Sequence, residues 1–222
     1  MTPVVRLTGV SKGYSTAEGP TRVLSDVGLT IEAGEKVSLI GPSGSGKSTL
    51  LSLIAGLLRP DDGTVEIDGL SMDDLDDAAR ARLRADRIGI ALQSDNLIPF
   101  LSAVENVEMA LAFGSRRPAR QRRAVALGLL DGFGLADRAA HRPRQLSGGE
   151  AQRVALAVSM ANRPSLLLAD EVVASLDART AAGVVDSILT APCAVLFVTH
   201  EVALADLAER RLSLADGGVR LR

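Results

Sequence analysis

Residues 41–49 read GPSGSGKST, a glycine-rich segment that ends in a lysine and two hydroxyl residues. The apolar run KVSLI precedes it and the apolar run TLLSLIAGLL follows its lysine and serine, so it connects a predicted strand to a predicted helix. Its glycines let backbone N–H groups surround an anion, and the helix start adds a positive dipole end. Lys47 contributes a positive charge for the β and γ phosphates, and the Ser48 hydroxyl can bind Mg²⁺. The segment therefore predicts nucleotide phosphate binding by Gly41, Pro42, Ser43, Gly44, Ser45, Gly46, Lys47, Ser48 and Thr49.

Polar side chains also follow three other apolar runs. Asp170 and Glu171 end the run LLLADE, His200 ends VLFVTH, and Gln93 ends IGIALQ. Parallel strands present the residues at their carboxyl ends along one edge of a sheet, so we expect these groups to lie beside the phosphate loop.

Each of these strand-end groups has a chemical role to which it is suited. Asp170 can hold Mg²⁺ through water, and Glu171 can orient or deprotonate an attacking water molecule. The carbonyl of Gln93 can bind Mg²⁺ or that water. A neutral His200 can sense the γ-phosphate, although a histidine in this position can also be a solvated or capping residue. The predicted catalytic residues are Glu171, His200, Gln93 and Lys47, and the predicted metal ligands are Ser48, Gln93 and Asp170.

A second glycine-rich stretch, QLSGGEAQR at residues 145–153, has no lysine. Ser147, Gly148 and Gly149 offer a hydroxyl and unhindered backbone N–H groups at the start of a predicted helix. These groups suffice to contact a phosphate but not to hold a nucleotide alone. The stretch therefore predicts half of an anion site.

The hydrophobic pattern defines the elements that must position these groups. The N-terminal third alternates like antiparallel strands, and residues 94–162 are predicted to form a helical insertion broken by prolines and glycines. The last third alternates apolar strands with helices, which predicts a parallel sheet covered on both faces. We expect one domain over residues 1–222, with an α/β core at about 1–93 and 163–222 and a helical subdomain at about 94–162.

Composition limits the function classes. The 222 residues are 46% hydrophobic and carry a formal net charge of −2, so no overall attraction for nucleic acid is expected. There is one cysteine, Cys193, and the first residues lack the pattern of a signal peptide. No apolar run reaches the ~18 to 20 residues that cross a bilayer. We therefore expect a cytoplasmic protein without a membrane span.

The chain resembles the nucleotide-binding subunits of ATP-binding cassette (ABC) transporters over nearly its whole length. GPSGSGKST, Gln93, LSGGE, LLLADE, SLD and His200 occur in the order typical of that family. The detail is most similar to ATPases of lipoprotein-release, macrolide-efflux and cell-division complexes, through NLIPFLSAVENVEMAL and LSGGEAQR. The resemblance implies a P-loop NTPase fold, in which a RecA-like parallel sheet carries an N-terminal antiparallel β subdomain and an inserted helical subdomain.

The resemblance also implies a mechanism and partners. The substrate would be ATP with Mg²⁺, held between the phosphate loop of one subunit and the LSGGE stretch of a second ATP-binding subunit, which we expect to be an identical copy. Asp177 would line the same contact between the two subunits. Tyr14 would stack on adenine, with a tyrosine in the core of the hairpin as the alternative. Integral membrane permease subunits would dock near Phe100 and Leu101, unless these side chains are buried, and would hold the protein at the inner face of the cell membrane.

Some positions depart from the family pattern. The usual DEPTGNLD is DEVVASLD here, with Val172, Val173 and Ala174 at the changed positions, and Ala151 stands where glutamine is usual. None of these changes removes a group assigned to the chemistry, so we expect turnover.

A chromosome-maintenance ATPase would need a long coiled coil in place of the ~50 residues between Gln93 and LSGGE. A translation-associated protein would usually carry two cassettes. A non-transporting ATPase switch of the cell-division type is the remaining alternative.

Overall fold

The computed structural model describes residues 2–16, 19–92, 97–114, 118–174 and 176–221. In this part of the chain the strands form a four-stranded and a six-stranded sheet. The smaller sheet is antiparallel and has the order β2 (Gly19–Ile31), β1 (Val5–Thr16), β4 (Asp62–Ile67) and β5 (Leu70–Ser71). The larger has the order β10 (Gly218–Leu221), β9 (Arg210–Ala215), β3 (Lys36–Ile40), β8 (Ala194–Val198), β7 (Leu166–Asp170) and β6 (Ile88–Ala91).

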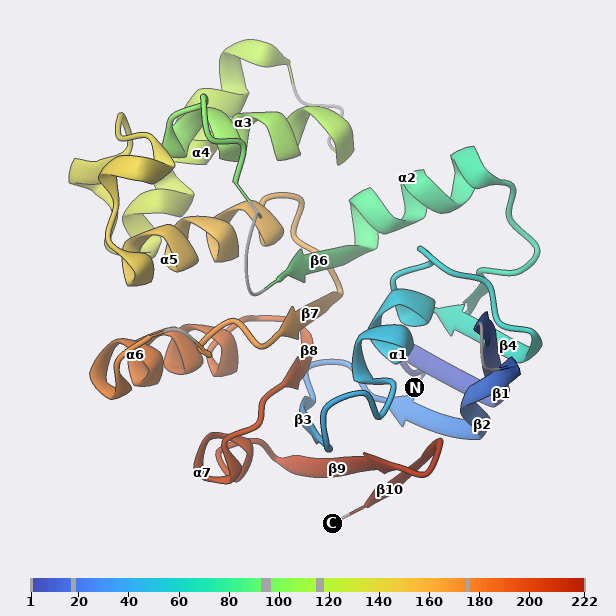
Figure 1. The fold of residues 1–222 in the computed structure, drawn as a ribbon. Coiled ribbons are helices and arrows are strands. Elements are labelled where there is room, and N and C mark those ends of the chain that lie inside the picture. The colour runs from blue at the N-terminus through green and yellow to red at the C-terminus, as the bar shows by residue number, and fades with distance from the viewer. Residues whose placement is uncertain (1, 17–18, 93–96, 115–117, 175, 222) are drawn as a thin grey trace.

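Neighbouring strands from β9 to β6 are parallel, and β10 pairs antiparallel with β9 at the edge. Because parallel strands need crossovers, helices connect them. Figure 1 shows α1 (Lys47–Ile54) between the two sheets and α6 (Ala178–Leu189) on the other side of the larger sheet. α2 (Asp77–Arg87) leads into β6, and the short α7 (Val202–Ala205) leads into β9.

The predicted helical insertion is present between β6 and β7. It contains α3 (Ala103–Gly114), α4 (Ala119–Gly132) and α5 (Gly148–Ser159), with 3₁₀ turns at Ala136–Arg138 and Pro143–Gln145. We call these three helices the helical arm. In Figure 1 the arm lies to one side of the two sheets, so the predicted fold class, with a parallel core, an antiparallel β subdomain and a helical insertion, is confirmed.

The described residues bury three hydrophobic clusters. The first lies around α1 and both sheets and includes Leu39 and Leu50. The second lies between α6 and the larger sheet and includes Phe197. The third fills the arm, and the partly buried Phe133 packs against both the second and the third. All five residues of β8 are buried because both faces of the strand are covered, which explains why its sequence is continuously apolar.

Two helices, α2 and α7, are shorter than the helix-favouring stretches of sequence in which they lie. The acidic run before α2 stays outside the helix, where Asp73 accepts a hydrogen bond from the Val65 N–H (3.1 Å) and Asp76 caps the helix by accepting one from the Ala79 N–H (2.7 Å). The composition of residues 201–209 favours a helix, but α7 ends at Ala205 and the chain turns into β9. Pairing with β3 therefore outweighs the local helical preference.

Candidate active site

The phosphate-loop segment lies between β3 and α1, at the carboxyl end of a central strand. Gly44 (φ 77°) and Gly46 (φ 99°) adopt left-handed backbone angles that other residues rarely take. A Cβ at Gly41 would lie 2.4 Å from the backbone oxygen of Leu214, so a side chain would not fit there either. The Lys47 ammonium is almost buried and donates to the carbonyl oxygens of residues 41 and 42 at 3.0 and 2.9 Å. The lysine thus curls over the loop.

The loop is chemically suited to an anion. The Ser45 hydroxyl oxygen is buried and has no hydrogen-bond partner in the described part of the chain. A buried hydroxyl without a partner costs free energy, so such groups usually mark a place for another molecule. A phosphate oxygen would accept from this hydroxyl and from loop N–H groups, and its charge would be balanced by Lys47.

Asp170 meets the phosphate loop from the end of β7. The Ser48 hydroxyl donates to the Asp170 carboxylate at 2.9 Å, which joins two segments far apart in the sequence. Burial, and secondarily the neighbouring negative charge of Glu171, raises the pKa of Asp170, although the bond from Ser48 opposes the shift. No group of three or more His, Cys, Asp or Glu within the described ranges could hold a metal ion. A hydroxyl and one carboxylate still fit Mg²⁺, which usually keeps waters and binds substrate phosphates.

Glu171 and His200 meet at the same edge of the sheet. The His200 Nε2 lies in hydrogen-bond contact with a Glu171 carboxylate oxygen, and both side chains are partly exposed. Glu171 has a left-handed backbone (φ 49°), and its N–H donates to the Val198 carbonyl at 3.1 Å. This backbone bond fixes where the carboxylate leaves the strand. The predicted convergence of Asp170, Glu171 and His200 beside the phosphate loop is therefore observed.

Gln93 lies outside the described residues, so its role as metal ligand and catalytic residue remains a prediction. The chain just before it is held by the Gln152 side-chain amide, which donates to the Leu92 carbonyl at 3.2 Å. This bond ties the end of β6 to α5.

The LSGGE stretch starts α5 as a capped helix. The Ser147 hydroxyl accepts from the Glu150 N–H at 3.3 Å, and the Glu150 carboxylate accepts from the Ser147 N–H at 2.8 Å. The hydrogen bond from the Ser147 N–H lowers the pKa of Glu150 to about 2, together with a bond that Arg138 donates to the Glu150 carboxylate at 2.8 Å. Ser147 and Gly148 are exposed, whereas Gly149 is buried. A preformed, accessible helix start is therefore available to a phosphate from another molecule.

Asp177 caps α6 next to that stretch. Its carboxylate accepts from the N–H groups of Arg179 (3.2 Å) and Thr180 (3.1 Å) and from the Thr180 hydroxyl (2.6 Å). The hydrogen bonds from Thr180 lower the pKa of Asp177. Beside this cap, the Thr180 methyl lies where a Cβ at Gly149 would be, at 2.2 Å. Asp177 and the LSGGE stretch thus share one well-packed junction.

Figure 1 shows that α5 starts at the end of the arm that lies away from α1 and runs towards the larger sheet, so its first turn is remote from the phosphate loop. Tyr14, on β1, is 41% exposed, which excludes the alternative of a buried core tyrosine. Phe100 is 70% exposed, and Leu101 is partly buried. The departures Val172 and Val173 are buried and pack in the second cluster, so apolar contacts hold the segment after Glu171.

Sequence reasoning missed two supporting residues. Thr180 follows the capping aspartate at the usual spacing of three, and Arg138 pairs with Glu150. The S-x-x-E spacing of Ser147 and Glu150 is a capping-box signal that could have identified the acidic residue. Arg138 had no such signal, because its partner is set by the folding of the arm.

The phosphate loop follows the central parallel strand β3, and an aspartate and a glutamate lie at the end of β7, with β8 between the two strands. This arrangement defines the class of P-loop ATPases. The comparisons with known proteins identify the family. The family model "ABC transporter" matches residues 24–174. The chain belongs to the ABC transporter family and is one of its ATP-binding, ATP-hydrolysing subunits.

Individual relatives agree with this assignment. An uncharacterized ABC transporter ATP-binding protein of Methanocaldococcus jannaschii, MJ0796, is 42% identical over 97% of this chain and 95% of its own. The lipoprotein-releasing system ATP-binding protein LolD 2 of Caulobacter vibrioides is 42% identical over 99% and 98%. A dimeric structure of MJ0796 in a post-hydrolysis state, bound to ADP and Pi, has a TM-score of 0.89 at 41% identity and covers 98% of this chain and 97% of that one. The transporter interpretation is therefore supported over the cell-division alternative.

Within the described residues, no helix combines the length and the apolar character that crossing a bilayer requires.

Proposed function

We propose that two copies of this chain bind two ATP molecules between them, each held by the phosphate loop of one copy and the start of α5 of the other. The observation that carries this proposal is the placement of two incomplete partners within one chain. The phosphate loop has a cradle and a lysine, whereas the capped turn at Ser147 is exposed and remote from that loop. Two-fold symmetry makes the two ATP sites between the copies alike. The MJ0796 structure is dimeric and bound to ADP and Pi, which supports a nucleotide-bound pair of copies.

Within each of these two ATP sites, this chain's own residues bind and orient the reacting groups. Gly44 and Gly46 leave space for the phosphates, and Lys47 exchanges its bonds to the loop carbonyls for phosphate oxygens. Mg²⁺, when bound at Ser48 and Asp170, would neutralise charge on the phosphates.

Glu171 orients the attacking water and accepts its proton at a carboxylate oxygen, and His200 keeps that carboxylate in place. The water oxygen forms a bond to the γ-phosphorus as the bond to the β–γ bridging oxygen breaks, which gives ADP and phosphate. Tyr14 is exposed on β1 and is suited to stacking on the adenine.

The proposed membrane partner docks on the arm side. Phe100 and Phe113 are 70% and 76% exposed, which is unusual for large apolar side chains in a chain with four Phe. A groove between α2 and α3 is lined by Phe113, Arg84 and Ala110 among others. An apolar helix end from an integral permease subunit fits such a surface. This partner would hold the protein at the cytoplasmic face of the membrane, and the LolD relative makes lipoprotein release the favoured kind of transport.

The variant Glu171→Gln tests the proposal. It keeps the size of the side chain and its ability to accept from His200, but it cannot take a proton. We expect ATP turnover to fall by at least about a hundredfold, because general-base catalysis contributes roughly that much. ATP binding should persist, and a dimer should accumulate in Mg-ATP. Size-exclusion chromatography with light scattering measures the dimer, and phosphate release measures turnover.

Lys47→Ala in the Glu171→Gln background is the matched control. It removes the cation that is bonded inside the loop, so nucleotide binding and the ATP-dependent dimer should both be lost. A Glu171→Gln protein that stays monomeric in saturating Mg-ATP would contradict the two-copy site. Normal turnover in this variant would contradict the role of Glu171.

A further inference from the structure

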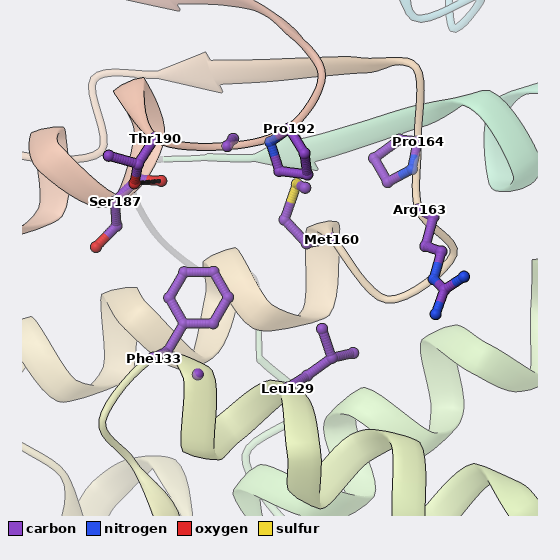
Figure 2. A pocket seen from close by; sticks show the side chains of 10 residues that line it. Leu129, Phe133, Met160, Arg163, Pro164, Ser187, Thr190 and Pro192 are labelled. Carbon is purple, nitrogen blue, oxygen red and sulfur yellow. Dashed lines mark hydrogen bonds between the residues drawn. The ribbon is translucent and has the colours of Figure 1, made fainter.

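A cavity of about 470 Å³ lies between the helical arm and the core, away from the nucleotide site. Its walls come from three places: the end of α4 with Leu129 and Phe133, the turn after α5 with Met160 and Arg163, and the end of α6 with Thr190 and the following Pro192. Figure 2 shows Arg163 at one end of this group, Thr190 and Ser187 at the other, and Leu129 and Met160 between them. The size of the cavity is within the ~300–1,000 Å³ of small-molecule sites.

The lining of the cavity is mostly apolar. Phe133, Leu129 and Met160 present apolar side chains, and Met160 points towards Pro192 in Figure 2. The two hydroxyls at the far end already donate within α6. The Thr190 hydroxyl bonds the Asp186 carbonyl at 2.8 Å, and the Ser187 hydroxyl bonds that of Gly183 at 2.9 Å.

The core wall of the cavity is held firmly. The ammonium of the buried Lys36 donates to the carbonyl oxygen of Ala191 at 2.7 Å and to that of Cys193. These bonds fix the backbone on both sides of Pro192. A wall that is already ordered loses little conformational freedom when a ligand binds.

Charge distinguishes the two ends of the cavity. The Arg163 side chain is exposed, and among the residues that the structure describes it has no ion pair or hydrogen bond. The helices α4, α5 and α6 all end near the cavity, and their partial negative charges would favour a cation. Those charges are fractional and decay within a turn, whereas the guanidinium carries a full charge at one end. The favoured occupant is therefore a molecule with an acidic head at Arg163 and an apolar tail along Phe133.

We propose that this cavity binds a small amphipathic carboxylate, such as a medium-chain fatty acid. The site does not overlap the nucleotide site, because Pro164 lines it just before β7 starts, whereas Asp170 ends that strand. Five strand residues span roughly 16 Å. The proposal is therefore independent of the proposed two-copy function, and a Lys47→Ala protein should bind the carboxylate as the unmodified chain does.

Isothermal titration of the full chain with sodium octanoate tests this. We expect saturable one-to-one binding with a Kd at or below about 1 mM. At matched chain length, 1-octanol and octylamine should bind more weakly. Arg163→Gln should weaken octanoate by about 2- to 5-fold, as expected for an exposed ion pair, and leave octanol unchanged, while Arg163→Lys should keep octanoate binding.

Two substitutions on α4 give a steric control. Gly132 lines the cavity, and Gly128 lies one turn earlier on the same helix; a Cβ would meet nothing within 4 Å at either position. Gly132→Leu should fill the cavity and weaken octanoate at least about tenfold, whereas Gly128→Leu should not. No saturable octanoate binding, tighter binding of octylamine or octanol, or equal effects of the two leucines would each overturn the proposal. Arg163→Gln tests it independently of how well the leucine variants fold.

Discussion

Replacing Gly149 by alanine tests how closely the start of α5 packs on α6. The new Cβ would lie 2.2 Å from the Thr180 methyl carbon, well inside van der Waals contact. That methyl cannot easily rotate away, because the Thr180 hydroxyl donates to the Asp177 carboxylate at 2.6 Å. The collision therefore falls on the junction between the LSGGE stretch and the cap of α6.

Two opposing effects set the size of the change. Alanine is favoured over glycine inside a helix by about 0.5–1 kcal/mol. Overpacking costs about 1–3 kcal/mol. We expect Gly149→Ala to lower the free energy of unfolding by about 0.5–2 kcal/mol. Thr180→Ser removes only the methyl and keeps the hydroxyl, and the next nearest atom, the residue 180 Cβ, is 3.6 Å from the new Cβ. In that background Gly149→Ala should raise the free energy of unfolding by about 0.5–1 kcal/mol.

Urea unfolding of the four proteins in this double-mutant cycle measures the effect without nucleotide. The expected coupling between the two positions is about 1–3 kcal/mol, with a change of sign between the backgrounds. If Gly149→Ala changes stability equally with threonine or serine at position 180, the packing argument is wrong. Leu127→Ala, at an exposed position on α4, is a control for nonspecific loss of stability.

Two further predictions concern single groups at the nucleotide site. Asp170→Asn removes a carboxylate whose pKa is raised by burial above its ordinary 3.8. The native state keeps that proton to higher pH than the unfolded chain, so wild-type stability falls as pH rises through and above 3.8. Without nucleotide, Asp170→Asn should therefore melt at a higher temperature than the wild type at pH 7. Near pH 3 the two proteins should melt at the same temperature. Mg²⁺-dependent protection by ATP should be lost, and a variant that is less stable at pH 7 would refute the linkage. Tyr14→Ala should weaken ATP binding by about 2- to 10-fold through lost stacking while Tyr14→Phe does not, measured by nucleotide fluorescence titration; equal effects would reject stacking.

The sequence predicted the chemistry at the strand ends better than the shapes of the connections. Lys47, Asp170 and Glu171 lie in short motifs whose backbone is set by neighbours along the chain, by glycines and by apolar strands. Their meeting also follows from a general property of parallel sheets, so the residues could be placed without long-range information.

Features that depend on packing between distant segments could not be placed in this way. The end of α7 at Ala205 is set by pairing of β9 with β3, and the contact of Gly149 with Thr180 is set by how α5 lies on α6. The burial of Val172 could not be inferred from an apolar residue within a loop motif. The cavity beside Phe133 arises where three helices end near one another, which no local pattern encodes.

The position of the first turn of α5, remote from the phosphate loop, has a genetic consequence in the proposed pair. A chain lacking Lys47 still offers an intact Ser147 turn, and a chain with a damaged Ser147 turn still offers Lys47. Each would be inactive when expressed alone. Random pairing in an equal mixture gives mixed dimers about half of the time. Each mixed dimer contains one ATP site that combines an intact Lys47 from one chain with an intact Ser147 turn from the other. Two defective alleles would therefore complement one another, although neither encodes a working protein.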